Sequence, residues 1–436
     1  MFRYKMNELI KWKESKDRKP LIIRGARQVG KTWLMKEFGK NYYEKCAYIN
    51  FDENKRMEGL FSNGFDIERI IQGLKIESGV NIEPENTLII FDEVQETPKA
   101  LTALKYFYEN ANQYHIVAAG SLLGVAMHEG TSFPVGKVDF IDLYPLNFYE
   151  FLDALGEKEI LKLIKNNDMS LITVFKETIK DYLKQYLYIG GMPEVVYSYS
   201  QNRDFYEVRN KQNRLLEAYE QDFSKHAPNN IVPRIRQLWN NIPTQLAKEN
   251  KKFIYGLIKQ GARAKEYELA LSWLIDCGLV YQINRVKDCK IPLSAYQDFN
   301  AFKLYVLDVG LLCAMAKIDS KTIIEGNEIF VEFKGSLAEQ FVLTEIKANI
   351  DTPIFYWSAE KGTSELDYII QLNNNNIPIE VKANENLQAK SLKVFVNKYN
   401  TKINVRTSMS DYRKEDWLIN IPLYLIGNIN KVIEVL

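Results

Sequence analysis

Short apolar runs separated by amphipathic stretches fill the first third of the chain. The runs of strand length lie at residues 21–23, 47–52, 88–91, 115–121 and 137–146. The stretches between them carry apolar residues at helical spacing, and one has a helix start in Thr97 and Pro98. Strands that alternate with helices are typical of a parallel sheet covered on both faces. We predict such an α/β domain for residues 1–150.

The next stretch, residues 151–225, has a helical pattern around the turn IGGMPE. Gly190 and Gly191 interrupt the pattern, and Pro193 prevents the helix from resuming at once. We expect helices here that form a lid over a ligand bound to the first domain. A plain helical connector between domains is the alternative interpretation.

Residues 226–318 combine helical and strand patterns. Apolar residues at 269, 271 and 273–275 suit a packed helix, and the strand-like runs LVYQINRV and AFKLYVLD follow it. Helices followed by a β-hairpin indicate a winged-helix-like region, which binds either DNA or a protein. The basic residues that could contact DNA phosphates are Lys251, Lys252, Lys259, Arg263 and Lys265. A solvated basic face is the alternative.

The last part, residues 319–436, places acidic and basic residues on successive predicted elements. Glu339 lies on a helix, Asp367 on a strand, and Glu380 and Lys382 lie two apart on the next strand. Residues i and i+2 of a strand face the same side, so we expect Asp367, Glu380 and Lys382 to converge. Two carboxylates and a lysine can bind Mg²⁺ and activate a water for phosphodiester hydrolysis.

This order of elements resembles the α/β restriction-endonuclease-like fold of the PD-(D/E)XK type. Asp367 and the run Glu380-Val381-Lys382 match its motif, and Glu339 is the least secure member. The basic bias between Lys382 and Arg406 suits a nucleic-acid surface. A Glu-x-Lys pair is also common on any solvated strand, so an inactive binding domain stays open as the alternative.

The first domain contains an eight-residue loop, GARQVGKT, at residues 25–32. It follows a predicted strand and precedes a predicted helix, and Gly25, Gly30, Lys31 and Thr32 stand in the G-x-x-x-x-G-K-[ST] pattern. Such a loop directs backbone N–H groups at a phosphate. The expected binding residues are Gly25, Ala26, Arg27, Gln28, Val29, Gly30, Lys31, Thr32 and Trp33. A glycine turn before a helix is the alternative interpretation.

Asp92 and Glu93 follow a buried apolar run, at the strand end where parallel sheets bind ligands. We expect Asp92 and Thr32 to hold Mg²⁺ and Glu93 to polarise a water, with Lys31 on the phosphates. Ser121, at the end of another strand, could contact the γ-phosphate or could simply form a turn. No N-K-x-D run is present, which favours ATP over GTP as the nucleotide.

Several runs together resemble the prokaryotic AAA-type ATPases that carry a C-terminal domain of unknown function. They are LIIRGARQVGKT, LIIFDEVQ, ALKYFYE, AAGSLL, LYPLNFYEF and YLYIGGMPEVV. The resemblance implies a P-loop AAA+ module that binds ATP. Similar sequences often have an arginine where Lys137 stands here, and Arg24 and Arg27 are other candidates for an arginine finger, which we leave unassigned.

Composition narrows the class of protein. The 436 residues carry a net charge of +1, which excludes a surface coated with positive charge but not local patches. Four cysteines without C-x-x-C spacing favour reduced thiols in a cytoplasmic protein over a zinc site. No apolar leader and no run of 18 apolar residues are present, so we expect no membrane partner.

Three functions remain in competition. The first is an ATP hydrolase that acts on DNA or RNA, and the second is an ATP-controlled switch that binds a protein partner. The third is a nuclease effector that stays inactive until ATP is bound or cleaved. The sequence is compatible with a homo-oligomer in each case and does not identify the cellular process.

Overall fold

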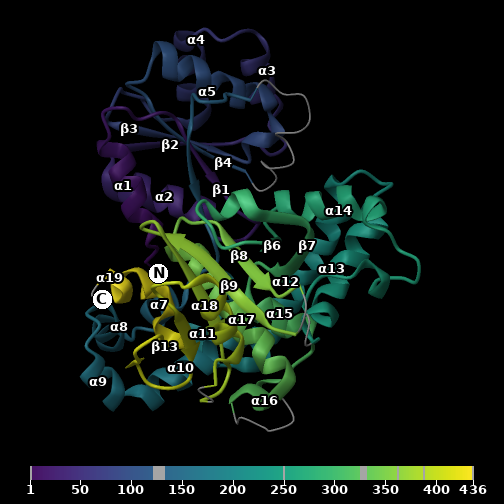
Figure 1. Cartoon of the computed structure of the whole chain (residues 1–436). Coiled ribbons are helices and arrows are strands. Elements are labelled where there is room, and N and C mark those ends of the chain that lie inside the picture. The colour runs from purple at the N-terminus through teal and green to yellow at the C-terminus, as the bar shows by residue number, and fades with distance from the viewer. Residues whose placement is uncertain are drawn as a thin grey trace. The chain divides into compact units, whose positions relative to one another are not determined.

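The computed structural model describes residues 2–120, 133–248, 251–324, 331–360, 363–385 and 388–434. The chain forms two compact units (Figure 1). The first is Met1–Pro145 with Asp276–Leu279, and the second is Leu146–Ile275 with Val280–Leu436. The division at 145/146 lies near the predicted boundary at 150/151. The further divisions at 225/226 and 318/319 stay predictions.

The first unit alternates strands and helices, as its sequence pattern predicts. Its helices are α1 (Lys5–Glu14), α2 (Lys31–Tyr42), α3 (Lys55–Ser62), α4 (Ile67–Ser78) and α5 (Pro98–Asn110). Its strands are β1 (Leu21–Arg24), β2 (Lys45–Asn50), β3 (Thr87–Asp92), β4 (His115–Ala119) and β5 (Asp139–Asp142). Pro98 opens α5, where its missing N–H costs no hydrogen bond. Thr97 holds the expected cap position, but its side chain makes no capping hydrogen bond.

The five strands form one parallel sheet in the order β2-β3-β4-β1-β5. Every residue of β3 is buried, because helices cover the sheet on both faces. Helices α3, α4 and α5 share an apolar core with one face, and α2 packs on β2, β3 and β4. This arrangement confirms the predicted α/β parallel-sheet domain. It brings the ends of β1 and β3 to one edge.

The second unit begins with helices, as predicted for residues 151–225. They are α7 (Phe148–Ala154), α8 (Lys158–Lys165), α9 (Met169–Val174), α10 (Lys176–Ile189), α11 (Pro193–Asn202) and α12 (Phe205–His226). Gly190 ends α10 with a φ of 77°, a conformation that favours glycine, and Pro193 opens α11. Whether these helices form a lid stays a prediction.

The rest of the second unit mixes helices and strands. The further helices are α13 (Val232–Leu246), α14 (Ala264–Asp276), α15 (Val309–Met315), α16 (Ser320–Ile324), α17 (Val331–Asn349), α18 (Lys390–Tyr399) and α19 (Ile429–Glu434). The strands are β6 (Val280–Val286), β7 (Gln297–Val306), β8 (Ile354–Ser358), β9 (Glu365–Leu372), β10 (Asn375–Val381), β11 (Val405–Ser408), β12 (Arg413–Lys414) and β13 (Ile419–Pro422).

These strands form one eight-stranded sheet in the order β12-β13-β11-β10-β9-β8-β6-β7. The hairpin β6–β7 follows α13 and α14, in the order that a winged helix has, and its identification as one stays a prediction. A single register pair, Arg285 with Tyr356, joins β6 to β8. The winged-helix-like region and the C-terminal strands therefore share one sheet across the predicted boundary at 318/319.

Candidate functional site

The loop between β1 and α2 has the backbone that its glycines predict. Gly25 has a φ of 146°, and a Cβ there would lie 2.2 Å from the carbonyl oxygen of Leu143. Gly30 has a φ of 94° and precedes the first residue of α2. Gln28 adopts a left-handed conformation although it is not glycine, which indicates a backbone constrained by its surroundings. The loop thus curves tightly into a cradle, and a side chain at Gly25 would collide with the backbone of Leu143.

Lys31 lies inside this cradle. Its Nζ donates to the carbonyl oxygens of Gly25 at 2.9 Å and Ala26 at 2.7 Å. Burial lowers the pKa of Lys31 to about 8, while the nearby carboxylates of Glu93 and Asp92 act to raise it. The ammonium therefore lies against the loop carbonyls, and its predicted contact with a phosphate stays a prediction.

Asp92 and Thr32 meet at the sheet edge, although 60 residues separate them. Thr32 Oγ1 donates to Asp92 Oδ2 at 2.8 Å. The Tyr48 hydroxyl of β2 donates to the same oxygen at 2.9 Å, and burial and Asp92 raise the pKa of Tyr48. A hydroxyl and a carboxylate are hard oxygen donors of the kind that Mg²⁺ prefers. The residues present therefore fit Mg²⁺.

Tyr48 is a further candidate residue of this site, and it could not be found from the sequence. It lies on β2 two residues before Asn50, which pairs with Asp92 in the sheet. Lys36 of α2 places its Nζ 3.7 Å from the centre of the Tyr48 ring. The adjacency of β2 to β3 was the signal needed to find it, and strand order cannot be read from local sequence alone.

Glu93 follows Asp92 and is half-buried. Its φ of 52° is left-handed, so the chain turns sharply at the end of β3. Gln95 Nε2 donates to Glu93 Oε2 at 2.7 Å, which fixes one carboxylate oxygen. The predicted general base thus has a partner that orients it. Ser121, the remaining predicted residue of this site, lies outside the described residues.

Two candidates for the arginine finger are engaged within the first unit. Arg24 forms a two-point ion pair with Asp142, at 2.7 and 2.9 Å, and lies 4.5 Å from the Phe140 ring centre. Lys137 pairs with Glu109 at 3.0 Å. Arg27 is half-buried in the loop and Trp33 is exposed on α2. The structure gives no reason to assign the finger to any of them.

The predicted C-terminal metal group is divided between two places. Glu339 is buried and accepts from Lys251 and from the Tyr305 hydroxyl, the latter at 3.0 Å. Burial alone would raise the pKa of Glu339, but the ammonium groups of Lys251 and Lys303 outweigh it and the pKa is lowered. Glu339 is therefore a buried carboxylate that is paired with a lysine.

Asp367 lies near Glu339, in an irregular part of β9. Phe355 pairs with Ile369 and Trp357 with Leu366, so two residues of β9 lie opposite one of β8, as in a β-bulge. Asp367 Oδ2 accepts from the Val381 backbone N–H at 2.7 Å. Burial raises the pKa of Asp367 well above its usual value, and the charge of Glu339 adds to the rise.

Glu380 lies on the other face of the sheet. Ile379 pairs with Tyr368, whose hydroxyl donates to the Glu339 backbone carbonyl of α17 at 2.9 Å, so the adjacent Glu380 faces away from α17. Its Oε2 accepts from the Leu392 N–H in the first turn of α18, where the helix dipole favours a carboxylate.

The predicted convergence of Asp367, Glu380 and Lys382 is therefore wrong for this structure. The alternation along β10 does keep Glu380 and Lys382 together, 2.8 Å apart, as predicted. The bulge in β9 and the capping role of Glu380 separate them from Asp367. Within the described ranges, no three or more His, Cys, Asp or Glu side chains form a group that could hold a metal ion. These residues do not fit Mg²⁺ as arranged.

Two predicted nucleic-acid contacts are also corrected. Arg406 is 1% exposed, and its guanidinium donates to Asn420 and pairs with Glu415. Lys251 forms an ion pair with the buried Glu339. Lys259, Arg263 and Lys265 are exposed, in and before the first turn of α14. Within the described parts of the chain, no ion pair involves these three side chains.

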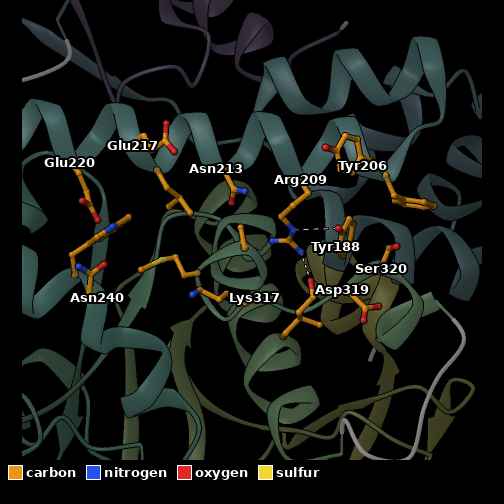
Figure 2. A pocket seen from close by; sticks show the side chains of 16 residues that line it. Tyr188, Tyr206, Arg209, Asn213, Glu217, Glu220, Asn240, Lys317, Asp319 and Ser320 are labelled. Carbon is orange, nitrogen blue, oxygen red and sulfur yellow. Dashed lines mark hydrogen bonds between the residues drawn. The ribbon is translucent and has the colours of Figure 1, made fainter.

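A cavity of about 730 Å³ lies in the second unit. Figure 2 shows Arg209 and Tyr188 at one end and Glu217 and Glu220 of α12 at the other. Arg209 donates to the Tyr188 hydroxyl at 3.3 Å and to the Ile318 carbonyl at 2.5 Å. The volume is typical of small-molecule pockets. None of the residues predicted from the sequence lines it.

Among the described residues, no helix is both long enough and apolar enough to span a bilayer. All four cysteines are free.

Comparison with known families gives three matches along the chain. Residues 17–152 match the family described as AAA domain. Residues 180–322 and 334–426 match two families described as domains of unknown function, DUF8612 and DUF4143. The first match, with the loop and the parallel sheet, supports an AAA-type P-loop ATPase domain in this chain.

Individual relatives are distant. The uncharacterized protein MJ1637 of Methanocaldococcus jannaschii is 24% identical over 220 residues, which are 48% of this chain and 44% of that protein. The chain thus spans less than half the length of this relative.

Among solved structures, the Walker-type ATPase PABY2304 of Pyrococcus abyssi is 14% identical, with a TM-score of 0.46 over 72% of this chain and 95% of that chain. The ORC1 protein of Aeropyrum pernix in complex with DNA is 11% identical, with a TM-score of 0.30 over 73% and 93%.

Proposed function

We propose that this chain, through its AAA-type domain, binds ATP with Mg²⁺ and hydrolyses it at the edge formed by β1 and β3. The contact between the Thr32 hydroxyl and the Asp92 carboxylate carries the proposal, because it joins the phosphate loop to the acidic strand end. The free cysteines agree with a reducing, cytoplasmic location.

Each side chain of the site has a distinct role in this proposal. The loop N–H groups and the Lys31 ammonium hold the β- and γ-phosphates. Thr32 and Asp92 would hold Mg²⁺, which neutralises charge on the phosphates when it is bound. Glu93, oriented by Gln95, accepts the proton of the attacking water.

Asp92→Asn tests the metal role directly. Asparagine keeps the size of the side chain but removes the charge that attracts Mg²⁺, so ATP affinity in Mg²⁺ should fall at least about tenfold. Equilibrium titration with a fluorescent ATP analogue measures it. In EDTA the variant and the parent chain should bind alike, and an equal loss in EDTA would contradict the metal role.

For the C-terminal domain, we propose a binding or regulatory role over phosphodiester cleavage. Asp367 and Glu380 are on different faces, and Glu339 is neutralised by Lys251. This arrangement favours the ATP-controlled switch over the ATP-gated nuclease. Stimulation of ATP turnover by polynucleotide would instead favour a task on DNA or RNA.

A second candidate function, contact with DNA, is supported by the exposed basic residues around the start of α14. Lys259, Arg263 and Lys265 lie within seven positions and are exposed, although the acidic Glu266 and Glu268 are exposed close by. A cluster of this kind favours phosphates of a nucleic-acid backbone, with an affinity that depends on salt.

Replacing Lys259, Arg263 and Lys265 together by alanine tests this contact. We expect duplex-DNA affinity to fall at least about tenfold and the salt slope to decrease by about three units or less. Fluorescence anisotropy at several salt concentrations measures both. The matched control replaces three exposed lysines of α8, Lys158, Lys162 and Lys165. Equal DNA binding by both triple variants would rule out this surface.

A further inference from the structure

Five charged side chains meet inside the second unit, near the place where a metal ion was expected. They come from four parts of the chain and are Lys251, Lys303, Glu339, Glu365 and Asp367. Lys303 is fully buried on β7 and pairs with Glu365 of β9 at 2.5 Å. We call these five residues the acidic centre.

Lys251 reaches the acidic centre from a segment without regular structure. Just after it, the Phe253 N–H donates to the Phe302 carbonyl of β7 at 2.8 Å, and the two rings stack 5.6 Å apart. The Gln245 side chain donates to the Ile254 carbonyl at 2.9 Å and accepts from the Ile254 N–H at 3.1 Å. The segment 251–254 is thus attached by a few local contacts and delivers one ammonium group.

We propose that Lys251 is an intramolecular plug, whose ammonium group occupies a cation position on Glu339 and closes the acidic centre to divalent metal ions. Withdrawal of the segment 251–254 opens this position. The proposal concerns the second unit alone and does not depend on ATP hydrolysis by the first.

The two lysines differ in what holds them. Lys303 is part of a strand and has no exposed surface, so it stays with Glu365 in any folded state of the sheet. The Lys251 side chain is 11% exposed and belongs to a segment outside the strands and helices. Of the two ammonium groups, Lys251 is the one that can leave without unfolding the sheet.

Charge balance explains why a metal ion would replace the Lys251 ammonium group beside Glu339. Without Lys251, the buried Glu339 carboxylate keeps the Tyr305 hydroxyl but loses its counter-ion, which is a costly arrangement. Carboxylate and hydroxyl oxygens are ligands that Mg²⁺ and Mn²⁺ accept, and Asp367 directly precedes Tyr368, whose hydroxyl donates to the Glu339 backbone carbonyl. Lys251 therefore does within the chain what a bound cation would do.

Lys251→Ala tests the plug in the full chain without nucleotide. The parent of this experiment is the full chain with Asp92→Asn, which weakens metal binding at the first unit, and every variant carries the same change. We expect Lys251→Ala to bind about one more Mn²⁺ per chain than its parent, counted by electron paramagnetic resonance. Its thermal unfolding temperature should be lower in EDTA and should rise on adding Mn²⁺, whereas that of the parent should not.

Three further variants separate the plug from a merely structural ion pair. Lys251→Arg keeps the charge and should behave like the parent, and Lys251→Ala with Glu339→Gln should lose the extra Mn²⁺. Lys251→Gln keeps a hydrogen-bond donor for Glu339 and serves if the alanine variant does not fold. The proposal is overturned if neither folded variant, Lys251→Ala or Lys251→Gln, binds more Mn²⁺ than the parent.

Discussion

Replacing Lys31 by alanine is expected to abolish measurable ATP binding. The Nζ of Lys31 lies within hydrogen-bond distance of two loop carbonyls, in the cradle proposed for the phosphates. A hydrogen bond to a charged group contributes about 1.5–3 kcal/mol. The loss of two such bonds to phosphate oxygens should weaken binding at least about a hundredfold.

Titration with a fluorescent ATP analogue measures this loss. Lys40→Ala is the matched control, because Lys40 is an exposed lysine in the last turn of the same helix. The circular dichroism of both variants should match that of the parent chain. Binding of the analogue by Lys31→Ala with parental affinity would show that the loop does not hold the phosphates.

Glu93→Gln should separate binding from hydrolysis. Glutamine has the size of glutamate and can accept a hydrogen bond from Gln95, but it cannot take a proton from water. ATP affinity should stay near that of the parent, while turnover should fall at least about a hundredfold. Phosphate release under saturating ATP and Mg²⁺ measures the turnover.

Glu44→Gln is the control for this change, since Glu44 is exposed between α2 and β2. It should hydrolyse ATP at the parental rate. Turnover by Glu93→Gln equal to that of the parent would remove Glu93 from the mechanism and leave the half-buried acid with a structural role, such as its contact with Gln95.

The loop and strand-end geometry of the proposed nucleotide site could be predicted from the sequence because its determinants are local. Gly25 and Gly30 fix the loop backbone within six residues, and an apolar strand ends at Asp92. The rules for parallel sheets bring the two together. Tyr48 could not be found in this way, because its contact with Asp92 depends on which strand lies beside β3.

The C-terminal group shows where local rules fail. Alternation along β10 does place Glu380 and Lys382 side by side. The bulge opposite Tyr356 changes the orientation of Asp367. The pattern of apolar and polar residues along β9 does not predict this bulge. The cation on Glu339 comes from Lys251, 88 positions away, and only tertiary packing reveals such a partner.

The single register pair between Arg285 and Tyr356 bears on how this chain could have been assembled from parts. A gene fusion or recombination at 318/319 would cut between two strands that share a sheet. It would leave β8 of the C-terminal piece with an unpaired edge, which is a template for aggregation. We therefore expect residues 319–436 to have been inherited together with the β6–β7 hairpin. A crossover point that preserves this sheet is expected before α13.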